Sequence, residues 1–284
     1  MAEIECPSFD SEVQRATEGL CGSVDTGSQT PLRLAFYTYS YTDRLQLDVE
    51  HVNSDSVSPE RRTQIRQAAA RYKLRVEAIV SHAELTASLF GEQPLDLMQS
   101  IDLACDLGGD VVTFHLGGPV EGVAPEVVWN KTVHAIREAA NHGDSRHVRL
   151  AIDLGPWPTW IVRNSNDLAK LIDDVGSPTF GVNFDPSYLA IQGIDPVGFV
   201  QRFGSRIRHV HVKDHIGKYP QWLHKIPGRG EFDYVSIVKA LAEARFDGSL
   251  AIECFTDMPL SEACEVGYNT LRLALRQAGI STVS

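Results

Sequence analysis

The stretch PLDLMQSIDLACDLGGDVVTFHLGG, residues 94–118, contains one unit of a repeating pattern. Residues 94–109 have the apolar spacing of a helix and end at a Gly-Gly pair, whereas residues 110–118 are typical of a short strand. The same alternation continues on both sides. Strands are predicted at 73–80, 148–155, 179–185, 207–214 and 248–255, and helices at 125–143, 165–175, 195–203, 233–245 and 260–278.

Strands that alternate with helices predict a parallel sheet, either doubly wound or closed as a barrel. No GxGxxG or GxxxxGK[ST] motif follows any of these strands, so the common nucleotide-binding forms of the doubly wound sheet lack their signature. A (β/α)8 barrel takes about 250 residues. We therefore expect a protein of the α/β class with a (β/α)8 TIM barrel as its catalytic domain over residues 31–284.

The beginning of the chain fits this plan less well. Residues 32–41 and 45–52 both resemble strands and would bring the count to eight, but only about three residues separate them, whereas a parallel crossover needs a dozen or more. Either a crossover helix is missing or one segment is not a barrel strand, so we expect irregularity at the first and second strands. Residues 1–30 include a helix candidate at 11–20 and a Gly/Ser/Thr-rich stretch, which predicts a mobile N-terminal extension.

Composition narrows the class of protein. The net charge is −11 and no basic stripe is visible, which argues against a nucleic-acid partner. No apolar run approaches the ~18 residues that span a bilayer, and the N-terminus lacks a signal-sequence pattern. The five cysteines are scattered, as reduced thiols are. We expect a cytoplasmic protein with a small-molecule substrate and no membrane partner; the sequence leaves homo-oligomer formation open.

The sequence HVHVKDH, residues 209–215, ends one predicted strand with alternating valine and histidine. Because side chains in a strand alternate between faces, His209, His211 and Lys213 share one face and the two valines share the other. A lone strand-end aspartate often caps a loop, and a lone inward histidine is usually a hydrogen-bonded core residue. Here the same parity turns an acid or a histidine inward at four further strand ends: His115, Asp153, Asp185 and Glu253.

Strand ends on one side of a TIM barrel meet at its C-terminal mouth, where active sites of this fold lie. Three carboxylates and an imidazole at one mouth would repel one another without a cation between them. Carboxylate oxygens with one histidine nitrogen suit a hard or borderline ion rather than a thiolate-type zinc site. We therefore expect one divalent ion, Mn²⁺ first, with Mg²⁺ or Co²⁺ as alternatives.

Five motifs give the chain a resemblance to a known family. FHLGG, NFDPSYL, HVHVKDH, PGRGEFDY and AIECF follow one another in the order of the xylose isomerase-like TIM barrels, the superfamily of sugar isomerases, ketose 3-epimerases, inosose dehydratases and endonuclease IV. The resemblance runs from about Leu74 to Leu275 and more weakly over FYTYS. It implies a metal held after the fifth to eighth strands by the following residues: Asp153, Asp185, His211 and Glu253.

Two positions depart from the family pattern. Asp153 stands where the family usually has glutamate, and Tyr188 stands in DPSY where the sixth-strand motif commonly reads D-x-x-H. Family epimerases use the fifth- and eighth-strand glutamates as an acid/base pair, so the shorter Asp153 puts two-base epimerisation in doubt. The chain also lacks the extra histidines and the D-R-H loop of endonuclease IV, which argues against DNA repair.

The resemblance implies a metal-dependent isomerase or epimerase that acts on a ketose or related polyol-ketone through an enediolate. Glu253 is the expected proton-transfer base, with Asp153 as its partner or as a ligand only. Alternatives are a dehydratase of the inosose or 3-dehydroshikimate type, or a sugar-binding barrel without turnover. Trp222 and Phe255 are candidates for an apolar wall, with a core position as the alternative. The expected substrate-binding residues are Lys213, Arg229, His115, Tyr188 and Trp157. Three of them have an alternative: Lys213 could instead pair with Asp214, Arg229 could be a solvated loop cation, and Trp157 could lie in the core.

Overall fold

The computed structural model describes the backbone of residues 33–37 and 44–48 and, beyond them, residues 57–71, 74–91, 97–157, 161–253 and 258–280. The N-terminal extension expected over residues 1–30, with its helix candidate at 11–20, lies outside the described residues. Among the described residues, no helix has the length and apolar character needed to cross a membrane.

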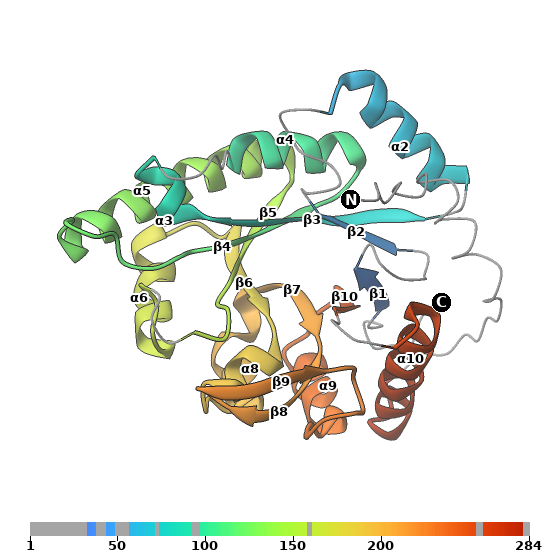
Figure 1. Ribbon diagram of the computed structural model, residues 1–284. Coiled ribbons are helices and arrows are strands. Elements are labelled where there is room, and N and C mark those ends of the chain that lie inside the picture. The colour runs from blue at the N-terminus through green and yellow to red at the C-terminus, as the bar shows by residue number, and fades with distance from the viewer. Residues whose placement is uncertain are drawn as a thin grey trace, which may run out of the picture.

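Eight strands close into a barrel, and every neighbouring pair is parallel (Figure 1). The order around the barrel is β1-β10-β7-β6-β5-β4-β3-β2, and the pairing of β1 with both β10 and β2 closes it. The predicted TIM barrel is confirmed. The barrel strands are β1 (Arg33–Tyr37), β2 (Arg44–Asp48), β3 (Arg75–Glu84), β4 (Val111–His115), β5 (Arg149–Asp153), β6 (Phe180–Phe184), β7 (Ile207–Val212) and β10 (Ser249–Ile252).

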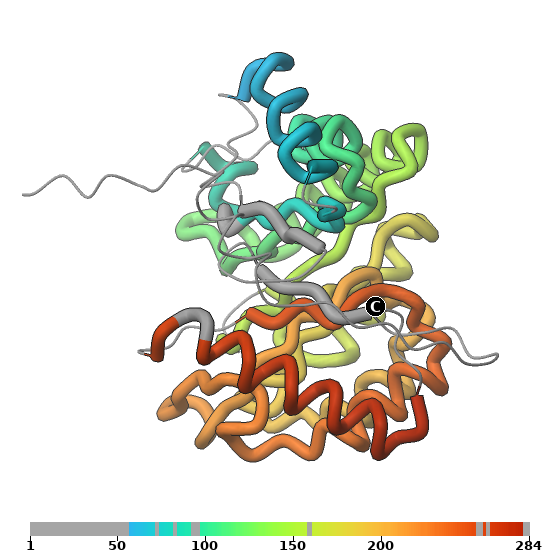
Figure 2. The backbone as a smooth tube through the Cα atoms, turned by 90° about the vertical axis from the view of Figure 1, so that its right-hand side faces the viewer, coloured from blue at the N-terminus to red at the C-terminus, as the bar shows by residue number. Residues whose placement is uncertain are grey.

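Helices follow the strands along the outside of the barrel. In Figure 1, α2, α4 and α5 lie on one side, and α8, α9 and α10 lie on the other. Figure 2 shows the C-terminal helix α10 running along the outer surface. The helices are α2 (Pro59–Arg71), α3 (Leu85–Leu89), α4 (Leu97–Leu107), α5 (Pro125–Arg146), α6 (Ser165–Val175), α7 (Pro186–Ile191), α8 (Pro196–Phe203), the 3-10 turn η1 (Gly204–Arg206), α9 (Tyr234–Glu243) and α10 (Leu260–Gln277).

The expected irregularity at the start of the barrel has a specific form. Both predicted segments are barrel strands, β1 and β2, and they pair directly in parallel. Only residues 38–43 connect them, whereas parallel crossovers usually take a dozen or more residues. The pairing of β2 with β3 also shifts register between Leu45 and Gln46.

Alternation along the strands separates an apolar outer face from the barrel interior. Ile152 of β5 and Val182 of β6 are fully buried in the main core cluster, which includes residues of the covering helices. Small inward residues form a separate cluster of Ala78, Val111 and Ala151 inside the barrel. The inward side chains therefore lie on the face predicted from strand parity, with polar groups at the C-terminal ends of the strands.

A β-hairpin, absent from the sequence prediction, follows β7 directly. It pairs β8 (Asp214–Lys218) with β9 (Gln221–Lys225) in antiparallel register. Asp214 anchors its base: this fully buried carboxylate accepts hydrogen bonds from the backbone N–H groups of His215 at 2.9 Å, Gly228 at 3.0 Å and Phe232 at 3.2 Å. A Cβ on Gly230 would overlap this carboxylate, which explains part of the glycine content of PGRGEF.

Replacing Asp214 with alanine should lower the free energy of unfolding by about 3 kcal/mol, because buried N–H groups lose a charged acceptor. Chemical denaturation with and without the substitution measures this loss. Asp247→Ala, at an exposed position, is the control and should change the stability by less than about 0.5 kcal/mol. Equal stability of the two variants would show that the hairpin does not depend on this anchor.

Candidate functional site

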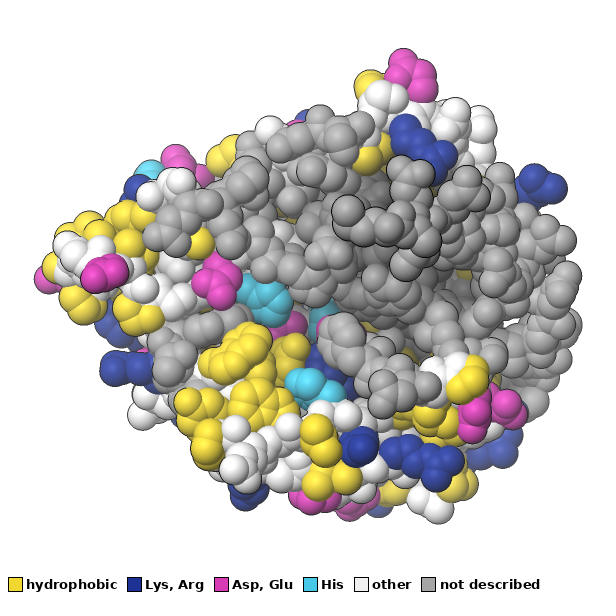
Figure 3. All heavy atoms as spheres, in the orientation of Figure 1, with side chains coloured by type: hydrophobic (Ala, Val, Ile, Leu, Met, Phe, Trp, Pro, Cys, Tyr) yellow, Lys and Arg dark blue, Asp and Glu magenta, His cyan; other side chains and the backbone are white. Residues whose placement is uncertain are grey.

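Three potential metal ligands from three strand ends meet at the C-terminal mouth of the barrel. Asp185 follows β6, His211 lies in β7 and Glu253 follows β10. One ligand atom from each lies within 4.8 Å of the others, and all three residues are buried. In Figure 3 this end of the molecule is a hollow with acidic, histidine and basic side chains inside and hydrophobic side chains along its lower edge.

The imidazole of His211 lies between carboxylates. Its Nδ1 is 3.0 Å from Glu253 Oε2, 3.5 Å from Asp153 Oδ2 and 2.8 Å from the side-chain amide of Asn183. Burial alone would lower the pKa of His211, but the charges and hydrogen bonds of Glu253 and Asp153 outweigh it and raise the pKa to about 9. Without a metal, the two carboxylates therefore favour the charged form of His211.

Asp153 lies beside the three-member group rather than in it. Its Oδ1 accepts a hydrogen bond from the backbone N–H of Gly155 at 3.1 Å, and its Oδ2 accepts one from Asn183 at 2.9 Å. Burial would raise the pKa of Asp153, but the hydrogen bond with His211 and the nearby positive charges lower it to about 2. Both oxygens of this shorter acid already have partners.

Asp185 begins α7 as well as facing the mouth. Its Oδ1 accepts hydrogen bonds from the backbone N–H of Ser187 at 2.9 Å, the hydroxyl of Ser187 at 2.6 Å and the backbone N–H of Tyr188 at 3.4 Å. Its Oδ2 points to Lys213. Burial, reinforced by the charges of Asp153 and Glu253, raises the pKa of Asp185. The helix start fixes one oxygen of this carboxylate and leaves the other for the site.

Lys213, expected to contact substrate, has no exposed surface. Its Nζ lies 2.8 Å from Asp185 Oδ2, 2.7 Å from Glu253 Oε2 and 4.0 Å from the centre of the Tyr188 ring. Burial would lower the pKa of Lys213, but the two carboxylates outweigh it and hold that pKa well above its usual value. Burial would raise the pKa of Glu253, but the positive charges of Lys213 and His211 outweigh it and hold that pKa well below its usual value.

The remaining predicted residues differ in exposure. His115 is partly buried, and β4 pairs it with Asp153 of β5. Trp157 is 43% exposed, and Arg229 is exposed in the loop after the hairpin. Trp222 stacks on Tyr219, with ring centres 5.8 Å apart. Phe255 lies outside the described residues.

Two residues of the site were not predicted from the sequence. Asn183 bridges Asp153 and His211, and strand parity, which turns it inward, was the signal that could have identified it. His224 comes from the hairpin, and its ring meets that of Tyr188 edge-on at 5.7 Å. Burial and the charge of Lys213 lower the pKa of His224 to about 4, so this side chain is neutral and able to hydrogen-bond to a neutral hydroxyl.

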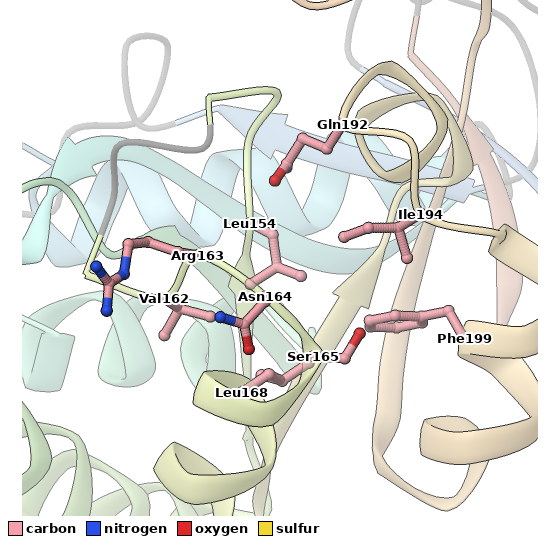
Figure 4. Close-up of a pocket in the computed structure, with 9 residues that line it drawn as sticks. All are labelled: Leu154, Val162, Arg163, Asn164, Ser165, Leu168, Gln192, Ile194 and Phe199. Carbon is pink, nitrogen blue, oxygen red and sulfur yellow. The ribbon is translucent and has the colours of Figure 1, made fainter.

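Two adjoining pockets lie beside the acidic centre. The first has essentially no room for a water molecule and includes Asp153, Asn183, Asp185 and Tyr188 in its lining. The second has only about 10 Å³ of space open to water and shares Leu154 and Phe199 with the first. Figure 4 shows its residues, contributed by the end of β5 and the segments around α6, α7 and α8: Leu154, Val162, Arg163, Asn164, Ser165, Leu168, Gln192, Ile194 and Phe199.

The residues at the mouth fit a divalent ion. Two carboxylates and an imidazole within 4.8 Å supply the oxygen and nitrogen ligands that such ions use. Asn183 and Asp153 contact Nδ1 of His211, the ring nitrogen that also faces Glu253, and so help to fix the position of the imidazole.

The sequence pattern matches a defined family over most of the chain. The description of that family is xylose isomerase-like TIM barrel, and the match covers residues 41–273. The chain belongs to this family. Among solved structures, the IOLI protein with a bound zinc atom superimposes with a TM-score of 0.72 at 14% identity, over 87% of this chain and 99% of that one. At this identity the similarity shows the fold alone.

The chain spans a little more than half the length of two relatives with named activities. Fructoselysine 3-epimerase of Shigella flexneri is 21% identical over 166 residues, 58% of this chain and 59% of that protein. Inosose dehydratase of Clostridium botulinum is 24% identical over 175 residues, 55% of this chain and 56% of that protein. The chain therefore resembles both sugar epimerases and dehydratases.

The raised pKa of His211 predicts a pH-dependent stability of the metal-free protein. The imidazolium–carboxylate contacts stabilise the fold fully below the ordinary pKa of 6.5 and lose this effect as the pH rises through about 9. In EDTA, the melting temperature should fall by roughly 5 °C between pH 6.5 and 9.5. His211→Asn should flatten this decline, and an equally steep decline in the variant would assign it to other groups.

Proposed function

We propose that this chain is a divalent-metal-dependent isomerase or epimerase of a ketose or related polyol-ketone. The observation that carries the proposal is the buried group of Asp185, His211 and Glu253 at the mouth of the barrel. Mn²⁺ is the proposed ion, since two carboxylates and one imidazole form an oxygen-rich ligand set. The related IOLI protein contains zinc, so zinc belongs in any test.

A bound ion would polarise the substrate carbonyl and make the proton on the adjacent carbon more acidic. Glu253 is the proposed base: it takes that proton while the electrons of the C–H bond move toward the carbonyl oxygen, forming an enediolate. The lowered pKa of Glu253 keeps it ionised at neutral pH. Return of the proton to the former carbonyl carbon, with transfer of the hydroxyl proton from one substrate oxygen to the other, gives isomerisation. Return of a proton to the opposite face of the original carbon gives epimerisation.

Dehydration is the second candidate function, and the state of Asp153 favours it. Epimerisation in two steps needs an acid or base on each face of the carbon, yet both oxygens of Asp153 accept hydrogen bonds from Gly155 and Asn183. A lyase needs Glu253 to remove the proton and a group that assists departure of the β-hydroxyl. The similarity to inosose dehydratase supports the same alternative.

Metal analysis followed by a substrate screen tests the proposal. The purified protein, loaded with Mn²⁺ or Zn²⁺, is incubated with ketoses, inososes and 3-dehydroshikimate. Conversion of a ketose supports isomerisation, loss of water supports the lyase, and no turnover with either ion excludes both. His211→Ala should lower metal occupancy about tenfold or more, and full occupancy in that variant would contradict the ligand assignment.

Glu253→Gln tests the base separately from metal binding. Glutamine keeps the size and one oxygen of the side chain but cannot accept a proton, so exchange of the substrate α-proton with deuterated water should fall by about 10²–10⁴-fold. NMR measures this exchange, with metal content and substrate binding as controls. Exchange at the wild-type rate would transfer the role to another residue, with Asp153 the next candidate.

A further inference from the structure

Lys213 stands apart from the other lysines of the described chain because it alone is among the buried residues. Its ammonium contacts Asp185 Oδ2 at 2.8 Å and Glu253 Oε2 at 2.7 Å, and the Tyr188 ring lies against it at 4.0 Å. The two carboxylates are also members of the three-residue metal group. A positive charge of the chain itself therefore lies in contact with two of the groups that would hold a metal.

Buried carboxylates need a positive partner, whether or not a metal is bound. Asp153, Asp185 and Glu253 are at most 5% exposed, and without a cation their mutual repulsion and lost hydration would oppose folding. Lys213 supplies one positive charge that, unlike a metal ion, is covalently part of the chain and cannot dissociate. The ion pairs of Lys213 thus keep Asp185 and Glu253 together in the metal-free protein.

The same charge opposes metal binding. A divalent ion lies about 2.1 Å from its carboxylate oxygens, so an ammonium in contact with those oxygens is only a few ångströms from the ion. Two cations at that separation in a buried site repel each other strongly. Binding of the ion must either displace Lys213 from its partners or proceed against its charge.

We propose that Lys213 is an internal counter-cation that stabilises the site without metal and weakens its affinity for a divalent ion. The inference rests on the proposed metal site, but it makes no use of the reaction. It predicts a protein that folds without metal and binds its ion reversibly, in contrast to a site whose fold requires the ion.

Lys213→Met removes the charge and retains an unbranched apolar side chain of similar length. In EDTA this variant should unfold at a lower temperature than the wild type, and saturating MnCl₂ should close most of that difference. Calorimetric titration with MnCl₂ should give a dissociation constant about tenfold lower than that of the wild type. Lys239→Met, at an exposed position of α9, is the matched control and should change neither quantity.

A second variant distinguishes charge from packing. Lys213→Met combined with Asp185→Asn removes the cation together with one of its carboxylates, so the double variant should regain stability in EDTA relative to Lys213→Met. If it regains none, the lysine acts through the packing of its stem and the inference is wrong. The double variant also provides the comparison if Lys213→Met alone fails to fold.

Weaker or unchanged Mn²⁺ binding by Lys213→Met would overturn the inference, because it would make Lys213 a residue that orients the ligands. Absence of Mn²⁺ binding in both the wild type and the variant would overturn the inference and the metal site together. A protein that gains affinity as expected but converts no ketose, inosose or dehydroshikimate would retain the counter-cation and lose the proposed enzymatic function. The two failures are therefore distinguishable.

Discussion

Repulsion among three carboxylates buried at one end of the barrel is the constraint on which the rest of the site depends. Asp153, Asp185 and Glu253 are all nearly inaccessible to solvent, and each such group is stable as an anion only with partners. His211 and Lys213 supply positive charge, while backbone and amide N–H groups bind the remaining oxygens. These contacts hold the acids in position for an ion and a substrate.

The hairpin adds side chains beside this centre that the barrel strands do not supply. Asp214 ties its base to the loop before α9, and the backbone N–H of Tyr219 donates to the carbonyl of Ile191 in α7. His224 thereby reaches the ring of Tyr188, which in turn covers Lys213. A polar, neutral side chain and an aromatic face are thus combined at the mouth, a design suited to hydroxylated ligands.

Much of the barrel could be predicted because strand and helix periodicity is a local property. The helices predicted at 165–175 and 260–278 are α6 and α10, within a residue at each end. The hairpin could not be predicted in this way, because its two strands are short. Gly217 lies within the first strand and Pro220 lies between the two, and both residue types indicate a turn when only the local sequence is considered. Asp214 anchors its base, and Gly228 and Phe232 reach that carboxylate only in the folded loop.

The sequence by itself determined which side chains face the barrel interior, because the alternation of a strand depends only on neighbouring residues. It therefore identified Asp185, His211 and Glu253 as inward groups at strand ends, and Asp153 beside them. Only the tertiary structure decided their partners: Lys213 reaches Glu253 across 40 residues of chain, and Asp153 turns to Gly155 and Asn183. Such contacts follow from strand register and barrel closure, which bring together groups that no local pattern relates.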